Sequence, residues 1–566
     1  MYNMKTKTIP CICLAIFISV CGMAQNALLI PPILEGPIYD LTMQQDTTYW
    51  SGNAYATMGY NGNILGPTLI FNKGEETTLN VTNDIGETTT THWHGAHVAP
   101  ENDGGPHTAI VQGDTWSPSF TVLDKACTLW YHPHQHHFTM KHVVLGLAGL
   151  IIVRDDEEAA LSLPRDYGVD DFPIIIQTKV LEEVGMNYEI GYSTTENGNG
   201  PNPNGDSSQF INATQNAVLD LPRQVVRLRI LNGVTHRVFN YGISDGSTFW
   251  QIGSDGGLLN DPVPLTKLML APGERAEILV DLTSYSVGNS FTFKSYASTM
   301  KNGFWGATEA FSTGTSPANY YPNPLNGIDF DLMTINVVAQ TASPVTSIPS
   351  SLVTVTQLDS TTVDVHRDKY FITAGGENTC PHISSTPGGS SADCFDVNVI
   401  NDVVALGSTE LWTLHGDDSQ YHPFHIHDVQ FNILERNGLP PPLNEKGLKD
   451  VVAIGPGEIV KIIMKFEDFV GDIPYMYHCH ILPHEDRGMM GQFIVDPNVY
   501  VDKNFSGVEL GTLSNPFNSI TEGATLGDHG VILNILSTGV HMEAPPSLLM
   551  DKSIQLIVHF PPVIIE

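Results

Sequence analysis

Histidine is concentrated in three short windows of this 566-residue sequence, residues 92–142, 415–427 and 478–484. These windows make up about an eighth of the chain and hold nine, four and three of its 22 histidines. Random placement does not easily produce such clustering. Four compact motifs stand inside the windows: His92-Trp93-His94-Gly95, Trp130-Tyr131-His132-Pro133-His134, His422-Pro423-Phe424-His425-Ile426-His427, and His478-Cys479-His480 followed by His484 and Met489.

The spacing within each motif indicates which side chains share a site. Residues i and i+2 of a strand point to one face and residue i+1 points to the other. Each His-x-His pair therefore aims two imidazoles at a common centre. Cys479 faces away from His478 and His480, and His422 faces away from the pair that follows it. Two metal sites are expected to share one short piece of backbone.

The site on the cysteine side can be assembled from Cys479, His422 and His484, with Met489 as a weak axial ligand. Two imidazoles, one thiolate and a distant thioether are the blue-copper ligand set. A structural zinc site would use four strong ligands and leave the other histidines unexplained. The eight other histidines of the motifs are too many for one metal ion. Shared among three copper ions, they leave coordination positions open for oxygen. These histidines are His92, His94, His132, His134, His425, His427, His478 and His480.

The rest of the sequence predicts an all-β protein of several domains. Hydrophobic residues make up 41% of the chain, and 51 Gly and 37 Pro suit a turn-rich β protein. Period-two alternation recurs, as in residues 77–81, 225–230 and 459–466, which favours β-sandwiches in series. Acidic residues outnumber Lys and Arg by 61 to 26, so phosphate backbones and anionic lipids would repel the chain. Nucleic-acid binding is thereby excluded.

The N-terminus is typical of an exported protein. Two lysines, an apolar stretch over residues 9–20 and a small-residue cleavage site make residues 1–24 an export signal. Lipidation at Cys21 is the alternative, but Val20 is bulky where such sites want a small side chain. No later segment approaches the ~20 apolar residues that a membrane span requires. We expect a soluble product, periplasmic or secreted.

Four cysteines remain once residues 1–24 are removed: Cys127, Cys380, Cys394 and Cys479. Export permits disulfides. A bridge between Cys380 and Cys394 would staple a turn-rich loop of little hydrophobic content. Cys127 lies in a strand-like run, where a buried apolar thiol is expected.

The four motifs, in this order, resemble those of the multicopper oxidases, the laccases and their relatives, over roughly residues 30–497. Residues 132–136, 146–150 and 480–486 carry the similarity to the bacterial three-domain enzymes. Residues 251–257 and 271–277 resemble the second domain of the family, which holds no copper. The resemblance implies three cupredoxin-like Greek-key β-sandwich domains, here residues 25–165, 166–340 and 341–500.

Residues 501–566 depart from that family. They resemble the opening coil of a right-handed parallel β-helix, a β-solenoid. Such solenoids need about three or more rungs to bury a core, and this segment is long enough for only two or three. We assign it no catalytic role.

The resemblance also assigns the ligands of four copper ions. His422, Cys479, His484 and Met489 form the type 1 site, which collects electrons. His92 and His425 hold the type 2 copper, and the type 3 pair is held by His94, His132, His134, His427, His478 and His480. In this family the sites lie between the first and third domains. The two histidine-bearing parts of the chain are therefore expected to meet.

Reducing O2 to two waters consumes four protons as well as four electrons, so the buried cluster requires acids. Asp103, eleven residues after His92, and Glu485, next to His484, match the acidic residues that the family uses for this purpose. The alternative is that both are ordinary loop carboxylates. Nearby histidines outside the ligand set are expected only beside the ligands or at the surface: His97, His107, His136, His137, His142 and His415.

The function that the resemblance implies is a laccase-like oxidase acting on phenolic or other organic donors. Copper-efflux members typically carry a methionine-rich insertion that recruits Cu(I), and this chain has no methionine from Thr334 to Ile463. Oxidation of Cu(I) or Mn(II) in metal detoxification is therefore the second interpretation. A copper-free scaffold in cell division is the non-enzyme alternative, which the full ligand set argues against. Copper nitrite reductases normally have two cupredoxin domains and lack the eight-histidine set.

Overall fold

The computed structural model describes residues 25–192, 206–317, 320–373, 380–513, 515–525, 529–541, 553–559 and 563–565. The predicted export signal, residues 1–24, lies outside the described residues. Within them strands dominate, and the longest α-helix has only seven residues, which confirms the all-β prediction. The α-helices are α1 (Thr139–Leu145), α2 (Asp156–Ala159), α3 (Leu482–Glu485) and α4 (Ile520–Thr525). Short 3-10 turns are η1 (Pro100–Asn102), η3 (Ala297–Thr299), η4 (Ser360–Thr362), η5 (Ser391–Asp393) and η6 (Leu443–Glu445).

Two sheets enclose the first hydrophobic core. The five-stranded sheet has the order β2 (Ile33–Glu35), β5 (Thr68–Asn72), β11 (Gly149–Arg154), β10 (Thr128–His132), β7 (His92–His94). Opposite it lie β4 (Asn53–Tyr60), β3 (Ile38–Trp50), β6 (Glu76–Asp84), β8 (Thr115–Trp116) and β9 (Ser119–Thr121). Along β6 buried side chains alternate with more exposed ones, because the strand has one face on the core and one toward solvent.

The middle of the chain builds a second pair of layers. One layer continues the sheet of β4 and consists of β13 (Asn187–Gly191), β12 (Asp171–Val184), β16 (Val225–Asn232), β21 (Arg275–Asp281), β18 (Phe249–Ser254), β19 (Gly257–Leu265) and, paired to β12, β14 (Ser208–Ile211). The other has the order β1 (Asn26–Ala27), β15 (Ala217–Pro222), β23 (Phe330–Val338), β22 (Ser290–Ser295), β17 (Phe239–Ile243), β20 (Leu268–Leu270). The domain boundaries predicted at 165/166, 340/341 and 500/501 stay predictions. The sheet that contains both β4 and β13 has strands from either side of the 165/166 boundary.

Two five-stranded sheets enclose the core of the third block. The first has the order β25 (His382–Ser384), β24 (Val365–Ile372), β27 (Thr409–His415), β31 (Ile459–Lys465), β29 (Asn432–Arg436). The second has the order β26 (Asp402–Ala405), β33 (Met490–Asp496), β32 (Tyr475–Cys479), β28 (His422–Ile426), β30 (Val451–Ile454). Met300, Trp305 and Tyr320, from a segment of the middle block, also pack into this core.

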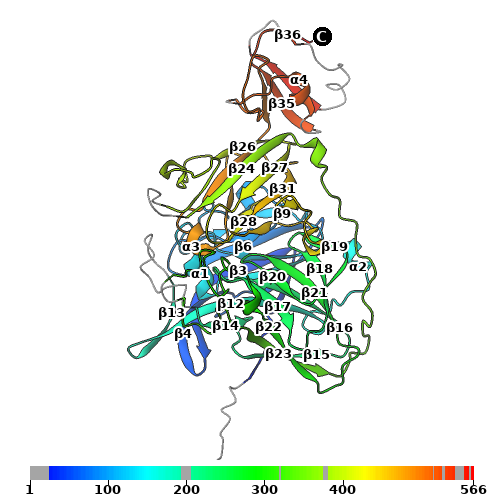
Figure 1. The fold of residues 1–566 in the computed structure, drawn as a ribbon. Coiled ribbons are helices and arrows are strands. Elements are labelled where there is room, and N and C mark those ends of the chain that lie inside the picture. The colour runs from blue at the N-terminus through cyan, green and yellow to red at the C-terminus, as the bar shows by residue number, and fades with distance from the viewer. Residues whose placement is uncertain are drawn as a thin grey trace, which may run out of the picture.

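The segment after residue 497 forms parallel strand ladders. They are β34 (Asn498–Val501), β35 (His529–Ile535) and β37 (Ser553–Val558), and beside them β36 (Gly539–His541) with β38 (Val563–Ile565). Figure 1 shows this segment, in orange and red at the top, beyond β24 and β26, with β4, β15 and β23 near the other end of the molecule. Ala405 of β26 joins its small core, which includes Val501 and Leu533.

Two cysteine predictions are confirmed. Cys380 and Cys394 form a disulfide, and Cys127 is a free, buried thiol. None of the helices in the described residues combines the length and the apolar character needed to cross a lipid bilayer.

The side chains of strand β16 are buried on both faces of the strand, and two of them are charged. Arg227 and Arg229 are 1% and 3% exposed, because this strand lies between the first and middle blocks. Arg227 donates to Glu158 and Glu277, and Arg229 Nη1 lies 2.8 Å from Glu277 Oε1. Glu277 also accepts a hydrogen bond of 2.6 Å from Thr128 Oγ1. A buried charge of this kind is tolerated only when it is paired and hydrogen-bonded.

We expect the Glu277 carboxylate to make folding dependent on pH. Burial alone would raise the pKa of Glu277, but Arg227 and Arg229 outweigh it and lower the pKa from 4.5 to about 2. The ionised form therefore stabilises the folded chain above about pH 4.5, by up to about 3 kcal/mol, and this contribution declines as the pH falls to about 2. Chemical denaturation should show Glu277→Gln less stable than wild type at pH 7, with the gap closing between pH 4.5 and 2. A gap that stays constant would contradict this assignment.

Candidate metal centre

Strand register aligns the four histidine motifs in pairs. Strands β7 and β10 run antiparallel with His92 opposite His132 and His94 opposite Trp130. Strands β28 and β32 do the same in the third block, with His425 opposite His478. Each pair of strands therefore presents its imidazoles from one surface.

The two surfaces face each other, so that the histidine-bearing parts of the chain meet. The rings of His92 and His427 stack at 3.9 Å between centroids, and those of His94 and His425 stack at 3.7 Å. All eight imidazoles are buried: His92, His94, His132, His134, His425, His427, His478 and His480. We call these eight side chains the imidazole cluster.

Within the imidazole cluster the nitrogens converge on three centres. One group is His92, His425 and His427, a second is His94, His132 and His480, and a third is His134, His427 and His478. In each group one nitrogen of every ring lies within 4.8 Å of the others. The groups adjoin, because His427 belongs to two of them.

Oxygen atoms outside the cluster fix which nitrogen of several rings faces inward. Nδ1 of His92 lies 2.9 Å from the carbonyl oxygen of Asp103, and Nδ1 of His132 lies 2.8 Å from that of Pro133. A carbonyl oxygen can only accept, so those nitrogens carry the hydrogen and the opposite nitrogens offer lone pairs to the centre. His427 is oriented the same way, with Nδ1 2.8 Å from Asp103 Oδ2.

The ring nitrogens that face the interior of the imidazole cluster are suited to bind a metal ion. His134 Nε2 lies 3.1 Å from His478 Nε2, and Nε2 of His92 and of His425 is buried without a hydrogen-bond partner. Burial lowers the pKa of His134 and of His480 to about 3, so both rings are neutral near pH 7. Metal–nitrogen bonds of about 2.0–2.1 Å at tetrahedral angles separate two ligand nitrogens by about 3.3 Å. Cations between these lone pairs would relieve both the repulsion and the missing hydrogen bonds.

A second group of possible ligands lies on the other side of β32. Cys479 Sγ is 3.5 Å from His422 Nδ1 and 3.7 Å from His484 Nδ1. His422 Nε2 donates to Asp418 Oδ2 at 3.0 Å, which leaves Nδ1 facing the sulfur. Burial raises the pKa of the Cys479 thiol well above its usual value, so a thiolate here requires a cation. We call Cys479, His422, His484 and the buried Met489 the cysteine site.

The loop after β32 holds Met489 beside Cys479. The Cys479 N–H donates to the carbonyl oxygen of Met489 at 3.0 Å, and the Met489 N–H donates to that of His484 at 2.8 Å. Met489 is fully buried in the third core. Met490, which follows it, is also buried and starts β33.

Two buried acids, Asp103 and Glu485, border the imidazole cluster. Asp103 lies between His92 and His427, and Glu485 Oε2 lies 3.2 Å from His478 Nδ1. Burial alone would raise the pKa of Glu485, but the neighbouring His478 and His134 hold it well below its usual range.

The sequence reasoning missed two further carboxylates. Asp450 Oδ1 lies 3.3 Å from His94 Nε2, and Asp418 contacts His422. Asp418 stands four residues before a predicted ligand, which is a weak signal. Asp450 has no such signal, because β30, which it precedes, reaches the cluster only through pairing with β28.

The other histidines near the motifs lie outside both groups. His97 bridges Asp428 and Asp468, His107 contacts Gln492, His142 contacts Thr89 and Glu87, His415 contacts Asp368, and His136 stacks on His137.

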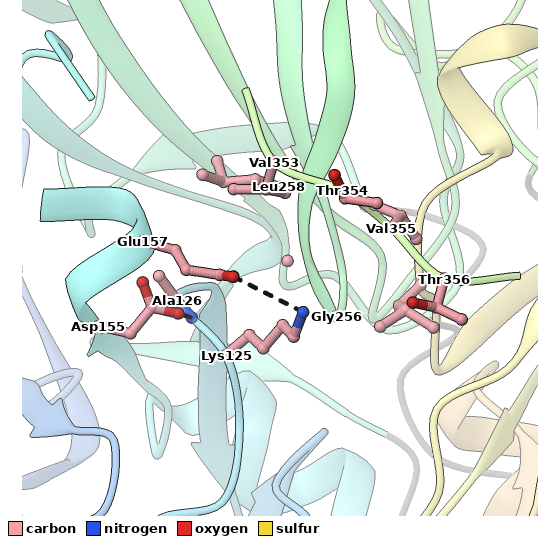
Figure 2. Close-up of a pocket in the computed structure, with 12 residues that line it drawn as sticks. Lys125, Ala126, Asp155, Glu157, Gly256, Leu258, Val353, Thr354, Val355 and Thr356 are labelled. Carbon is pink, nitrogen blue, oxygen red and sulfur yellow. Dashed lines mark hydrogen bonds and ion pairs between the residues drawn. The ribbon is translucent and has the colours of Figure 1, made fainter. Parts of the chain in front are cut away.

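A surface pocket between the first and middle blocks is separate from both groups. Figure 2 shows it between Lys125 and Glu157 on one side and residues Val353–Thr356 on the other. The Lys125 Nζ lies 3.6 Å from Glu157 Oε2. None of the described residues that line this pocket is a histidine or a cysteine.

Comparison with known proteins agrees with this geometry. Two family models, both described as multicopper oxidase, match residues 42–158 and 353–499. A curated protein of Staphylococcus epidermidis named multicopper oxidase mco is 31% identical over 84% of this chain and 93% of its own length. The cell division protein FtsP of Photorhabdus laumondii is 30% identical over 84% of this chain and 93% of its own length.

Among the solved structures that resemble this fold are two multicopper oxidases. The laccase-like multi-copper oxidase CueO of Ochrobactrum sp., whose title reports oxidase activity towards lignin model compounds and lignosulfonate, superposes with a TM-score of 0.70 at 32% identity. The match covers 83% of this chain and all of that one. A multicopper oxidase of Campylobacter jejuni, titled a metallo-oxidase, has a TM-score of 0.67 at 25% identity and covers 83% of this chain and 96% of its own.

Proposed function

Because this chain belongs to the multicopper oxidase family, we propose that it is an exported, laccase-like enzyme that couples one-electron oxidation of phenolic or other organic donors to reduction of O2 to water. The observation that carries the proposal is the position of Cys479. Its sulfur faces His422 and His484, while the residues on either side of it belong to the imidazole cluster.

The donor atoms suit four copper ions. The cysteine site would hold type 1 copper, His92 and His425 type 2 copper, and the type 3 pair would be held by His94, His132, His134, His427, His478 and His480. Bound copper supplies one-electron redox chemistry at the cysteine site and O2 reduction at the imidazole cluster. Thiolate, thioether and imidazole ligands are those that copper prefers.

Strand β32 provides the connection between the two sites. From the Cys479 sulfur, the covalent path to the imidazole of His478 or of His480 runs through one peptide link in each direction. Strand β32 is fully buried, and the path is covalent, so an electron would pass along it without any movement of the chain.

His484 is where electrons would enter. It is 8% exposed, whereas His422, Cys479 and Met489 are fully buried. An organic donor need only approach the edge of this one ring, because electron transfer does not require the donor to bind copper. The oxidase activity towards lignin model compounds that the Ochrobactrum title reports supports organic donors.

Asp103 and Glu485 would deliver protons. Each molecule of O2 takes up four electrons and four protons and yields two waters, and the protons must cross a buried cluster. The Asp103 carboxylate contacts His427, and the Glu485 carboxylate contacts His478, so each lies at the border of the imidazole cluster. Either carboxylate can pass a proton inward only if it recovers one from outside.

Two other functions remain as alternatives. Oxidation of Cu(I) or Mn(II) is favoured by the Campylobacter jejuni structure, whose title calls it a metallo-oxidase. A non-enzymatic role in cell division is favoured by the similarity to FtsP. Retention of every expected ligand position in two compact, buried groups argues against a scaffold without copper.

We expect Cys479→Ser to abolish the visible absorption of type 1 copper and to stop turnover. Serine offers no thiolate, so both the absorbing ligand and the path to His478 are lost. Cys127→Ser is the matched control, because Cys127 is also a free, buried thiol. Copper-loaded proteins should be compared by absorption and by oxygen uptake. Retained absorption in Cys479→Ser would refute the type 1 assignment.

We expect Asp103→Asn and Glu485→Gln to slow O2 reduction by about 100-fold or more, since a positioned acid contributes about 10²–10⁴. Reduction of type 1 copper by a donor without oxygen should be unchanged. Stopped-flow absorption separates the two steps. Glu101→Gln is the control, an exposed acid in the same loop as Asp103. Equal loss of both steps would contradict a role in proton delivery.

Oxygen uptake with matched donors distinguishes the organic from the metal-ion function. We expect kcat/KM for simple phenols to exceed that for Cu(I), because no run of methionines stands in residues 334–463 to recruit a cuprous ion. The reverse order, with Cu(I) or Mn(II) oxidised faster than any phenol, would favour the metal-ion function. Copper binding without oxygen uptake from any donor would favour the scaffold.

A further inference from the structure

We propose that Arg275, from the middle block that supplies no copper ligand, is a positioning residue for the imidazole cluster. It holds Asp450, and Asp450 orients His94 and His425. This inference rests on the proposed function, because it concerns how that site holds its copper. It adds a contribution of the middle block that the ligand motifs do not contain.

Arg275 is fully buried, and every N–H of its guanidinium has an acceptor. Nη1 and Nη2 each lie 2.6 Å from one oxygen of Asp450, a bidentate pair. The other hydrogen bonds go to backbone carbonyls of Thr128, Gly273 and Asp255, at 3.0, 3.0 and 3.1 Å. Arg275 thus ties together the first, middle and third blocks. A lysine has the charge but lacks this planar fork.

Asp450 sets the direction in which two rings present their lone pairs. Its Oδ1 lies 3.3 Å from His94 Nε2, and its carbonyl oxygen lies 2.8 Å from His425 Nδ1. Since both oxygens can only accept, His94 Nδ1 and His425 Nε2 are left for the interior. His94 Nδ1 indeed faces His132 Nε2 at 3.4 Å, and His425 Nε2 has no hydrogen-bond partner.

Two glycines show how closely the Arg275–Asp450 pair fits the cluster. Gly95, which ends the first motif, has φ +89°, and a Cβ there would collide with the Asp450 carboxylate and the Arg275 guanidinium. Gly273 has φ +83°, and a Cβ there would lie 2.9–3.0 Å from the His480 ring. The pair and its loop therefore press directly against His94 and His480.

Arg229 offers a matched control. It too is buried in the same interface, is paired with Asp171 and Glu277, and donates to Thr128. No hydrogen bond or ion pair links it to a histidine among the described residues. Loss of either arginine leaves buried carboxylates unpaired, so both substitutions should destabilise the fold.

The test compares copper-loaded wild type, Arg275→Met, Arg275→Lys and Arg229→Met during dialysis against a copper chelator. Readouts are copper per chain, type 1 absorption, the electron paramagnetic resonance signal of type 2 copper, and Tm. We expect Arg275→Met to hold cluster copper about 10–100-fold more weakly, as when a group that orients a ligand is removed. Its type 1 absorption should match wild type, and Arg275→Lys should be intermediate. Arg229→Met should lower Tm but keep all its copper.

Equal retention of cluster copper in Arg275→Met and wild type would overturn the inference. So would parallel loss in Arg229→Met, or loss of type 1 absorption together with cluster copper, since either indicates a general loss of structure. If Arg275→Met does not fold, the near-isosteric Asp450→Asn carries the same expectation. A wild type that binds copper but reduces no O2 would contradict the proposed function, whereas the copper comparison would still decide the role of Arg275.

Discussion

The antiparallel register between β28 and β32 is the constraint on which the rest of the site depends. With Phe424 opposite Cys479 and His425 opposite His478, alternate side chains of both strands separate onto two faces. One face completes the imidazole cluster and the other supplies the cysteine site. A shift of one residue would exchange the faces, so the register itself determines that two different sites lie one residue apart.

Burial and the surrounding hydrogen-bond acceptors determine which ring nitrogens can bind a metal. All eight imidazoles are buried, and a neutral ring can present a lone pair only from the nitrogen that does not carry its hydrogen. Backbone carbonyls and carboxylates around the cluster make that choice for most rings. Among these acceptors, the buried Asp450 carboxylate is paired with Arg275. Arg227 and Arg229 pair in the same way with other buried carboxylates, which do not contact the cluster.

Sequence reasoning could predict the strands and the facing of the histidines within each motif because both depend on short spacing, whereas Asp103 and Glu485 were predicted from the resemblance to the multicopper oxidases. Alternation along β6 and the His-x-His pairs are local patterns that survive folding. It did not predict that Arg227 is buried. Alternation indicates that a strand has two faces, but not that other parts of the protein cover both faces. Nor could sequence reasoning reach the pairing of β1 with β15, which joins residues nearly two hundred positions apart. Asp450 was missed for the same reason, since its partners come from three separate parts of the chain.

A chain could keep every histidine of the cluster and still present the wrong nitrogens if the group that fixes them were lost. Asp450 acts on His94 and His425, and its own position depends on a guanidinium from a block with no ligands. A complete set of ligand motifs is therefore not sufficient for a working copper cluster. The oxygen acceptors that orient the rings, such as Asp450, and the residues that hold these acceptors, such as Arg275, are required as well.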